Sequence, residues 1–521
     1  MTKGIRRKAR SLVERGFSIR GALNQIANRL RPHFAVDTRS LAALRIALGI
    51  ILLLDLFQRA SSLELLYTSH GVYPLSVHEA TYGQGGGISL HAISDMPWFQ
   101  RAMLSIAGLF ALAFTAGYRT RLVGAVSLLL LVSLHIRNPT ILNGGDRLLR
   151  VLLFVALLTP LGERWSIDSL RRGSARRSVA SVGTVALLAQ PLVVFTVNAI
   201  EKRRGEHWYA GEALEIALYD STMATSIGTA LLEFPTLLTW LTYGWVALLA
   251  GAVPLLLGTT GRARTLAAVA YLAAVVGMAL TLSVGLFPLV LAASVTPFVT
   301  EAFWNWSTRR VPKRVSERVS SAPVPQSLDS QPIEERIYER LEAYDYGPST
   351  DRVAAVGRSA VVFASVVILL WMLTFAAVDV TGSEPPAPFD SAHLDQQEWG
   401  LYAPDPAPST HWHVTEVKLE NGSTIGARNL GVVDFDRPPN ARAAYESFRH
   451  RSYYQTLDSL TRGTQESPMS SRYTEWTCDR MTEATGVDTE RITVYRVQQP
   501  KPIGEIVRPS DRVTIVDRSC Q

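Results

Sequence analysis

The sequence predicts a polytopic α-helical membrane protein of about nine transmembrane helices, with a C-terminal extracytoplasmic α+β domain. Two observations predict this fold class. Apolar runs recur at lengths near the roughly 20 residues that cross a bilayer core, and basic residues lie beside these runs on one side. Hydrophobic residues make up 47% of the 521 residues and charged residues 19%, but these averages mix separate apolar and charged blocks. Insertion into a membrane explains this segmentation.

The predicted spans follow the apolar runs along the chain. Several are short for a full crossing. Their count also depends on Gly285–Pro288, which is either a tight turn between two helices or a kink in one long helix. The spans lie at approximately Leu41–Phe57, Ala102–Tyr118, Leu122–Ile136, Leu148–Leu161, Val182–Ile200, Leu237–Leu257, Leu266–Val284, Phe287–Phe303 and Val353–Val378.

Orientation follows from the excess of Lys and Arg in short cytoplasmic loops. Residues 1–33 contain nine Lys or Arg and a single acid, Glu14, so we expect the N-terminus in the cytoplasm. The first apolar run begins only near Leu41, too late for a cleavable signal peptide. The loops expected inside are basic, and the long outer loop 60–97 has no Lys or Arg. Two outer segments, His135–Arg150 and Glu201–His207, break the rule and require another explanation.

This topology divides the chain into five parts and predicts a multi-pass protein of the cell membrane. The parts are a basic cytoplasmic N-terminal segment (1–36), a transmembrane domain (37–305), a cytoplasmic linker (306–352), a final transmembrane helix (353–379) and an extracytoplasmic α+β domain (380–521). The expected partners are the lipid bilayer and a small lipophilic ligand. Nucleic acid is not expected, because the residues behind the net charge of +7 flank the apolar runs.

Strands and helices are both expected in the C-terminal domain. Asn421–Gly422 is a hairpin-turn signal between strands at 411–419 and 424–433. Further strands are expected at 491–497 and 512–516, and helices at 441–460 and 470–485. The two cysteines, Cys478 and Cys520, both lie in this domain, either as a disulfide or as two free thiols. No zinc-type ligand set is found, so we expect no metal site.

The most informative polar cluster, Glu201–Trp208, follows directly on an apolar run. Ionisable residues at membrane depth are costly, so they line cavities, pair with one another or snorkel to the interface. In one interpretation Lys202 and Arg203 snorkel, and Trp208 belongs to an interfacial aromatic belt. In the other, Lys202 occupies a dehydrated cavity, where a lysine becomes available as a neutral base. Lys202 is then the candidate catalytic base, and the cavity-lining candidates from this cluster are Glu201, Arg203, His207 and Trp208.

A second polar insertion on the same side, Arg137–Arg147, adds the cavity-lining candidates Asn143, Asp146 and Arg147. Asp146 is suited to cap the helix that follows, near its positive N-terminal end. The alternative is a cavity-lining pair with Arg147 or Arg150. In the first span, Asp55 and Arg59 are four residues apart, a spacing that allows an intrahelical ion pair.

A family resemblance rests on the segment Val197–Lys202, which is followed by Trp208 and Gly211. It resembles the Lys-to-Trp-to-Gly signature of the vitamin K-dependent γ-carboxylase superfamily, whose prokaryotic members are called HTTM (horizontally transferred transmembrane) domain proteins. The resemblance covers roughly residues 35–305, and Trp399–Pro406 looks like the start of the outer domain of many relatives. Other landmarks in the same order are Arg45 to Arg59, Gly71–Pro74, Asn143–Asp146 and Trp165–Asp168.

The resemblance implies that Lys202 is the base that deprotonates a lipid quinol, with a lipid quinone as cofactor and a quinol-dependent carboxylase-like or epoxidase-like activity. Two positions depart from the animal enzyme. Lys202 lies one residue farther from Trp208 than the lysine does in that enzyme, so Arg203 matches the lysine when the two sequences are aligned without a gap. Pro139 follows Asn138 where that enzyme has a catalytic histidine. The leading hypothesis is redox-linked chemistry on a bound quinone in an outward-facing intramembrane cavity. The alternative is a non-enzymatic, membrane-anchored binding or export-associated protein that acts through its outer domain.

Overall fold

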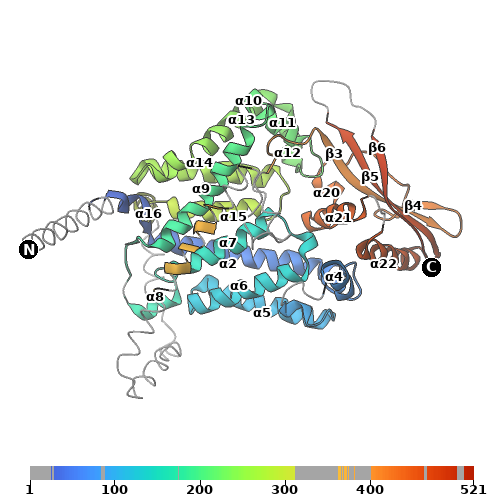
Figure 1. Cartoon of the computed structure of the whole chain (residues 1–521), viewed down its shortest axis with the longest axis horizontal. Helices are drawn as coiled ribbons and strands as arrows, with labels where there is room; N and C mark the ends of the chain where they lie inside the picture. Colours follow the sequence, from blue (N-terminus) through green and yellow to red (C-terminus); the bar gives the residue numbers. More distant parts are fainter. Residues whose placement is uncertain are drawn as a thin grey trace, which may run out of the picture.

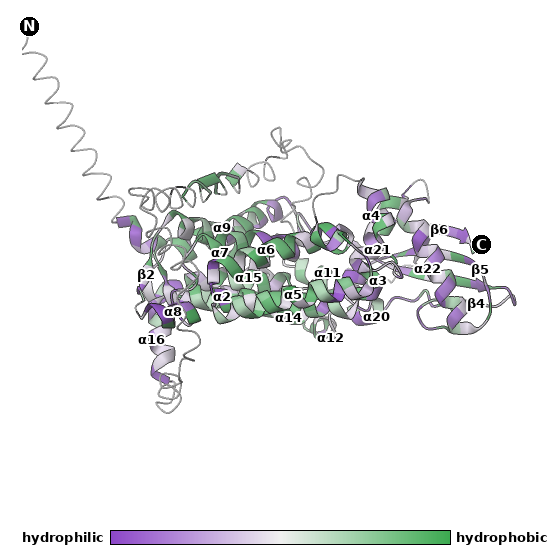
Figure 2. Ribbon diagram, turned by 90° about the horizontal axis from the view of Figure 1, so that it is seen from below, coloured by the Kyte–Doolittle hydropathy of each residue, from purple (hydrophilic) through white to green (hydrophobic). Residues whose placement is uncertain are grey.

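A computed structural model describes residues 29–83, 89–173, 175–310, 401–462, 466–501 and 510–520, together with a few isolated residues. The molecule is elongated, with a bundle of helices at one end and an antiparallel sheet flanked by helices at the other (Figure 1). Hydrophobic residues predominate along the bundle, and polar residues are more frequent in the sheet domain (Figure 2). The described chain is therefore mostly helical, with a C-terminal sheet region.

Five described helices are long and apolar enough to cross a membrane, and a sixth span results if one bent helix pair is counted. The five are α2 (Thr38–Ser61), α5 (Pro97–Ala116), α6 (Thr120–Arg137), α9 (Val182–Lys202) and α14 (Gly261–Thr281). In the bent pair, α15 (Phe287–Val295) and a 3-10 turn at Thr296–Phe298 meet α16 (Glu301–Arg310) at 99°. Pro297 lies in that turn, where a proline interrupts helical hydrogen bonding.

The remaining predicted spans correspond to shorter helices or to residues outside the described chain. The fourth is α7 (Gly144–Leu157), with 14 residues, and the sixth is α13 (Pro235–Ala250), continued by a π-helical turn at Val253–Leu257. The prediction at Val353–Val378 lies largely outside the described residues. Gly285, with φ of 68°, lies in the connection between α14 and α15. The segment is therefore a turn between two helices and not a kink in one long helix.

Helix α2 is the centre of the bundle and contacts α5, α7 and α15. Its Gly49 permits a close approach to α5, because a Cβ atom at that position would meet Thr115 Oγ1 at 2.0 Å. Helix α7 lies inside the bundle with Leu148, Leu149, Leu152 and Leu153 buried. A short helix can be accommodated there because its neighbours, and not lipid, surround it.

Short helices form the end of the bundle that faces the C-terminal domain (Figure 1). The loop after α2 contains α3 (Leu63–Tyr67), α4 (Leu75–Tyr82) and a 3-10 turn at Leu90–Ala92, and a second 3-10 turn at Pro139–Ile141 precedes α7. Between α9 and α13 lie α10 (His207–Ala210), α11 (Ala213–Leu218), α12 (Ser226–Ala230) and a 3-10 turn at Leu231–Glu233. None of these described segments is long enough to span a bilayer. At the opposite end lies α8 (Ile167–Arg172), and β1 (Val36–Asp37) pairs with β2 (Ser178–Val179).

The C-terminal domain has a four-stranded antiparallel sheet in the order β4-β3-β5-β6. Its strands are β3 (Ser409–Leu419), β4 (Thr424–Gly426), β5 (Thr489–Pro500) and β6 (Asp511–Ser519). Asn421–Gly422 forms the expected hairpin turn, with Gly422 at φ of 83°. Strand β4 is shorter than predicted, because the chain turns back at Leu430, whose φ is 54°, and the Gly426 amide donates to the Gly431 carbonyl.

The helices of this domain are α20 (Ala441–Ala444), α21 (Phe448–Thr461) and α22 (Pro468–Thr485). The predicted helix 441–460 is divided in two, because Tyr445 is extended and Ser447 caps a new helix by accepting a hydrogen bond from the His450 amide. Cys478 in α22 and Cys520 after β6 are joined by a disulfide.

Helices α21 and α22 attach the domain to the end of the bundle that the short helices form. Thr456 Oγ1 donates to the Thr140 carbonyl at 2.9 Å, and Arg472 Nε donates to the Gly71 carbonyl at 2.9 Å. A second contact region lies beside α12, where the Ala441 amide donates to the Ala224 carbonyl. The domain is thus attached to the bundle along several elements, and the two features described next lie at this junction.

Candidate functional site

Lys202 is the last residue of α9, and its side chain is only 2% exposed. Its ammonium group donates a hydrogen bond to the carbonyl of Leu401 and lies 4.3 Å from the centroid of the Trp208 ring. The Trp208 indole donates in turn to the carbonyl of Tyr402 at 3.0 Å. No carboxylate among the described residues forms an ion pair with Lys202. The lysine is therefore covered by the start of the C-terminal domain and does not reach the surface.

Residues 401–405, here called the cover, are attached to the loop that follows Lys202. The Asp405 carboxylate accepts hydrogen bonds from the Glu206 amide at 2.7 Å and the His207 amide at 3.0 Å. Gly205 lies against the same segment, since a Cβ atom there would meet the Pro404 carbonyl at 2.2 Å. The cover is thus held by contacts that leave no room for a larger residue at position 205.

An apolar cavity of about 670 Å³, here called the bundle cavity, lies beside this group. Helices α9, α11, α13, α14 and α15 form its walls, and Leu401 and Tyr402 close one end. Its few polar side chains include Asn198, Trp208 and Tyr402. Lys202 itself does not line the cavity: its contacts Trp208 and Leu401 do, so they separate the ammonium group from the cavity.

Of the seven residues predicted to line a cavity with Lys202, Trp208 lines the bundle cavity. Glu201 forms an ion pair with Arg204 at 3.0 Å, and His207 pairs with Glu212 at 2.9 Å. Arg203 is exposed to solvent. The other three predicted residues, Asn143, Asp146 and Arg147, lie at the start of α7.

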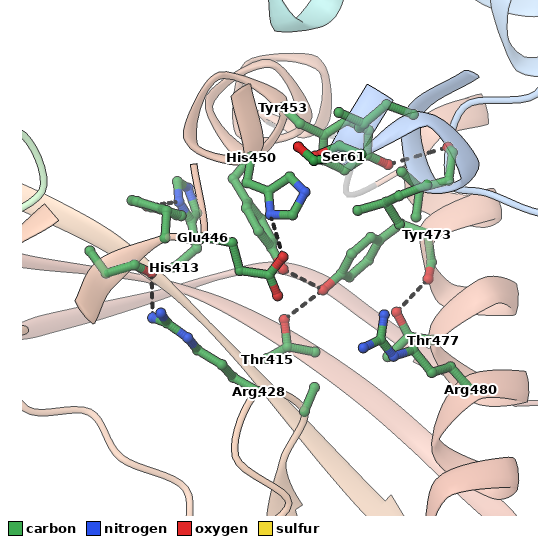
Figure 3. Close-up of a pocket in the computed structure, with 18 of the residues that line it drawn as sticks. Ser61, His413, Thr415, Arg428, Glu446, His450, Tyr453, Tyr473, Thr477 and Arg480 are labelled. Carbon is green, nitrogen blue, oxygen red and sulfur yellow. Dashed lines mark hydrogen bonds and ion pairs between the residues drawn. The ribbon is translucent and has the colours of Figure 1, made fainter. Parts of the chain in front are cut away.

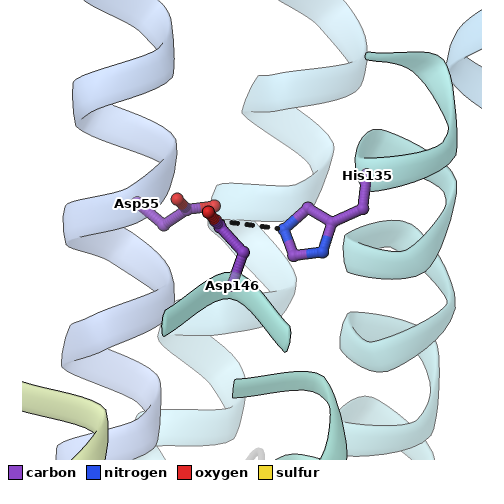
Figure 4. A group of neighbouring side chains, drawn as sticks. All are labelled: Asp55, His135 and Asp146. Carbon is purple, nitrogen blue, oxygen red and sulfur yellow. Dashed lines mark ion pairs between the residues drawn. The ribbon is translucent and has the colours of Figure 1, made fainter. Parts of the chain in front are cut away.

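The start of α7 belongs to a second feature, a buried group of ionisable side chains here called the charge cluster; Figure 4 shows three of its members, Asp55, His135 and Asp146. It contains Asp55, Arg59, His135, Asp146 and Arg449, all at most 4% exposed. Arg59 Nε lies 2.8 Å from Asp55, and Arg59 Nη2 lies 2.9 Å from Asp146. Arg449 forms ion pairs with both carboxylates, and His135 Nε2 lies 3.5 Å from Asp146.

Asp146 therefore acts as a cap and as an ion-pair partner. One of its oxygens accepts from the Asn143 amide at 2.9 Å, and the Asn143 side chain accepts from the Asp146 amide at 3.2 Å, which completes a capping box. The arginines that pair with it are Arg59 and Arg449, and not the Arg147 or Arg150 considered from the sequence. The Asp55–Arg59 pair is present as the helical spacing suggests.

The charge cluster does not fit a metal ion, although Asp55, His135 and Asp146 present ligand atoms within 4.8 Å of one another. The carboxylate oxygens are already in contact with the guanidinium groups of Arg59 and Arg449. Two arginines balance the charge of two aspartates, and a divalent cation would be repelled by both. The arrangement is a closed ion network.

Arg449 is the member of the cluster that sequence reasoning missed. It lies on α21 of the C-terminal domain and is separated from Asp146 by 303 residues. No local spacing connects the two positions. His135 could have been found, because a histidine within a predicted membrane helix is a recognised signal of a polar site.

The charge cluster and the bundle cavity are neighbours at the start of α7. A Cβ atom on Gly145 would lie 2.6 Å from the backbone nitrogen of Phe287, whose side chain lines the bundle cavity. Asn143 also donates to the Val284 carbonyl at 3.1 Å. A shift of α7 would therefore reach the cavity wall directly.

Comparison with known proteins gives one match. The family model described as HTTM domain matches residues 33–304, which include Lys202, Trp208 and all members of the charge cluster except Arg449. No curated protein and no solved structure matches the chain.

Replacing Arg449 tests the charge cluster. Arg449→Gln leaves a buried carboxylate without its counter-charge, and we expect the free energy of unfolding to fall by about 3–5 kcal/mol. Thermal unfolding of the detergent-purified protein measures this loss. The matched control is Arg442→Gln, since Arg442 is an exposed arginine of the same domain. The double variant Asp55→Asn/Arg449→Gln restores neutrality and should recover part of the loss, whereas a purely additive result would contradict the ion network.

Proposed function

The chain belongs to the HTTM domain family, and from this premise we propose that it binds a lipid-soluble quinone in the bundle cavity and carries out redox-linked chemistry there. The family match and the apolar helices identify a multi-pass membrane protein. The observation that carries the proposal is an apolar cavity closed at one end by the contacts of a buried lysine.

The size and the lining of the bundle cavity support a quinone. Its volume of about 670 Å³ lies within the range of small-molecule sites, which are mostly apolar with a few polar groups. The polar groups Asn198, Trp208 and Tyr402 are suited to orient a ring that carries oxygen atoms. Trp240, which lines the cavity, is 69% exposed on α13, so an isoprenoid chain could pass from the cavity into the surrounding lipid.

The proposed topology places the C-terminal domain on the extracytoplasmic side. Helices α8 and α16 lie at the end of the bundle opposite the sheet (Figure 1) and carry the basic residues Arg171, Arg172, Arg309 and Arg310. Basic residues favour the cytoplasmic side. In this proposal α7, α13 and residues 353–379 also cross the membrane, residues 1–36 and 306–352 are cytoplasmic, and residues 380–521 are outside.

Lys202 is proposed to accept a proton from the bound ligand. A quinol supplies two electrons and an ionisable hydroxyl group. For the Lys202 amine to receive that hydroxyl proton, the Leu401 carbonyl must release its hydrogen bond and the Trp208 ring must move aside. The cover thus controls access to the base, and a carboxylase-like or epoxidase-like reaction would begin only when the cover opens.

The alternative function is non-enzymatic binding or export-associated activity through the outer domain. The observation in its favour is that this domain forms a second, larger pocket with the bundle, lined by none of the residues around Lys202.

Filling the bundle cavity tests the quinone site. Gly277 lines the cavity, and a Cβ atom there would meet nothing within 4 Å, so Gly277→Leu can occupy the ligand's space. We expect native mass spectrometry with added menaquinone to detect a complex with the wild-type protein and roughly tenfold weaker binding to the variant. Gly108→Leu is the control, because Gly108 also faces open space but lies on α5 outside the cavity. Equal binding to all three proteins would exclude this cavity.

Replacing Lys202 tests the chemistry separately from binding. Because Lys202 does not line the cavity, Lys202→Ala should retain quinone while oxygen-dependent oxidation of added menaquinol falls by a factor of about 100 or more. The neighbouring exposed residue gives the control Arg203→Ala, which should behave as wild type. Unchanged oxidation by Lys202→Ala would assign the lysine a structural role. The absence of oxidation in every protein would favour the binding alternative.

A further inference from the structure

A pocket of about 1280 Å³, here called the outer pocket, lies between the C-terminal domain and the outer ends of α2, α3 and α5. Figure 3 shows side chains from both parts around it, including Ser61 from α2 and His413, Tyr453 and Tyr473 from the C-terminal domain. The quinone proposal does not use this pocket. Its two ends differ in chemistry, and this difference indicates the kind of molecule that would fit.

The lower end lies on membrane helices and combines apolar side chains with the exposed ion pair of Arg101 and Glu64. Leu56 and Phe57 of α2 and Leu104 of α5 line it, and α2 and α5 are neighbouring candidate spans. Phe57 is 75% exposed, and Ser105 of α5, which also lines the pocket, is exposed as well. Since the surroundings of these helices are lipid, the pocket continues into the outer surface of the bilayer. A hydrocarbon chain leaving the pocket would follow the seam between the two helices.

The upper end contains cations and anions without ion-pair partners among the described residues. Arg428 donates only to backbone carbonyls of residues 442–444, and Arg480 lies 5.0 Å from the centroid of the Trp476 ring. Asp434 and Asp436 line the same pocket, and neither forms an ion pair with a described residue. Unpaired groups of both signs are suited to a ligand that itself carries both signs.

The histidines of this end do not add to the positive charge near neutral pH. Burial lowers the pKa of His413 to about 3, with a smaller contribution from His411, and burial also lowers the pKa of His450. The Glu446 carboxylate lies 3.3 Å from His450 Nδ1 and is largely exposed, so it can take a second partner. The Nε2 atoms of both histidines are buried and lack a hydrogen-bond partner in the described chain.

Aromatic rings surround the polar end. His413 stacks on Tyr454 with ring centroids 5.4 Å apart, and Tyr445, Tyr473 and Trp476 complete the group. Aromatic faces attract an ammonium group, and the attraction is larger where water is excluded. A guanidinium group is suited to a phosphate, and a carboxylate together with aromatic faces is suited to an amine.

We propose that the outer pocket binds one phospholipid with a zwitterionic, primary-amine headgroup, with the phosphate at Arg428 and Arg480 and the ammonium group among Glu446 and the aromatic rings. The acyl chains leave along α2 and α5 into the bilayer. The occupant is a membrane lipid and not a soluble amine phosphate, because a ligand without acyl chains would not contact the apolar side chains of the lower end. The protein would then recognise the chemical type of the lipid that surrounds it.

The test measures lipid binding to the full chain by native mass spectrometry in detergent, with equal amounts of phosphatidylethanolamine and phosphatidylglycerol. We expect the first lipid to bind at least roughly tenfold more tightly. Arg480→Gln should weaken it by removing the phosphate contact, and Ser105→Phe should weaken it by blocking the seam. Arg442→Gln, an exposed arginine that does not line the pocket, is the control.

Three outcomes would overturn this assignment. They are preference for phosphatidylglycerol, phosphatidylethanolamine binding that neither variant changes, and binding of glycerophosphoethanolamine as tight as that of the full lipid, which would point to a soluble ligand. Gly277→Leu separates this proposal from the quinone site, because it fills the bundle cavity and should leave phospholipid binding intact. Near-native thermal unfolding of each variant verifies that a loss of binding is not a loss of fold.

Discussion

The ion network of Asp55 and Asp146 with Arg59 and Arg449 is the constraint on which the rest of the structure depends. Two carboxylates in the interior of a membrane bundle are strongly unfavourable unless counter-charges and hydrogen bonds compensate for lost hydration. The bundle supplies one counter-charge, Arg59, from the same helix as Asp55. The second, Arg449, comes from the C-terminal domain. The two carboxylates therefore have both of their ion-pair partners only when that domain is docked.

This docking fixes the parts of the molecule that carry the proposed functions. Phe448, next to Arg449, packs against Gly285, where a Cβ atom would approach the ring to 2.8 Å and where φ is 68°. Glycine has no Cβ atom, so it allows both the close contact with Phe448 and the positive φ. The docked C-terminal domain also brings the cover over Lys202, and it forms the upper wall of the outer pocket. A change in the charge balance at Asp55 and Asp146 is thus connected to both cavities through the docking of the C-terminal domain.

Much of this arrangement follows from local sequence patterns, which describe individual elements. The apolar runs predicted the positions of α2, α5, α6, α9 and α14, and Asn421–Gly422 predicted the β3–β4 hairpin. The spacing of Asp55 and Arg59 predicted their ion pair. Contacts between segments that are far apart in the chain leave no such pattern in the sequence. The partners of Lys202 and Asp146 from the C-terminal domain, Leu401 and Arg449, are determined by how that domain packs on the bundle. The short α7 also depends on the neighbouring helices that surround it.

Because Arg449 belongs to the domain that carries the cover, we expect its ion pairs to keep the cover over Lys202, and hydrogen–deuterium exchange of the amides of Glu206 and His207 tests this claim most directly. Both amides donate to Asp405 of the cover, so their protection reports whether the cover is in place. In folded Arg449→Gln protein we predict that these amides exchange faster than in the wild type, while the centre of α9 keeps its protection. Unchanged protection at Glu206 and His207, with the bundle equally intact, would contradict the account by showing that the cover is held independently of the ion network.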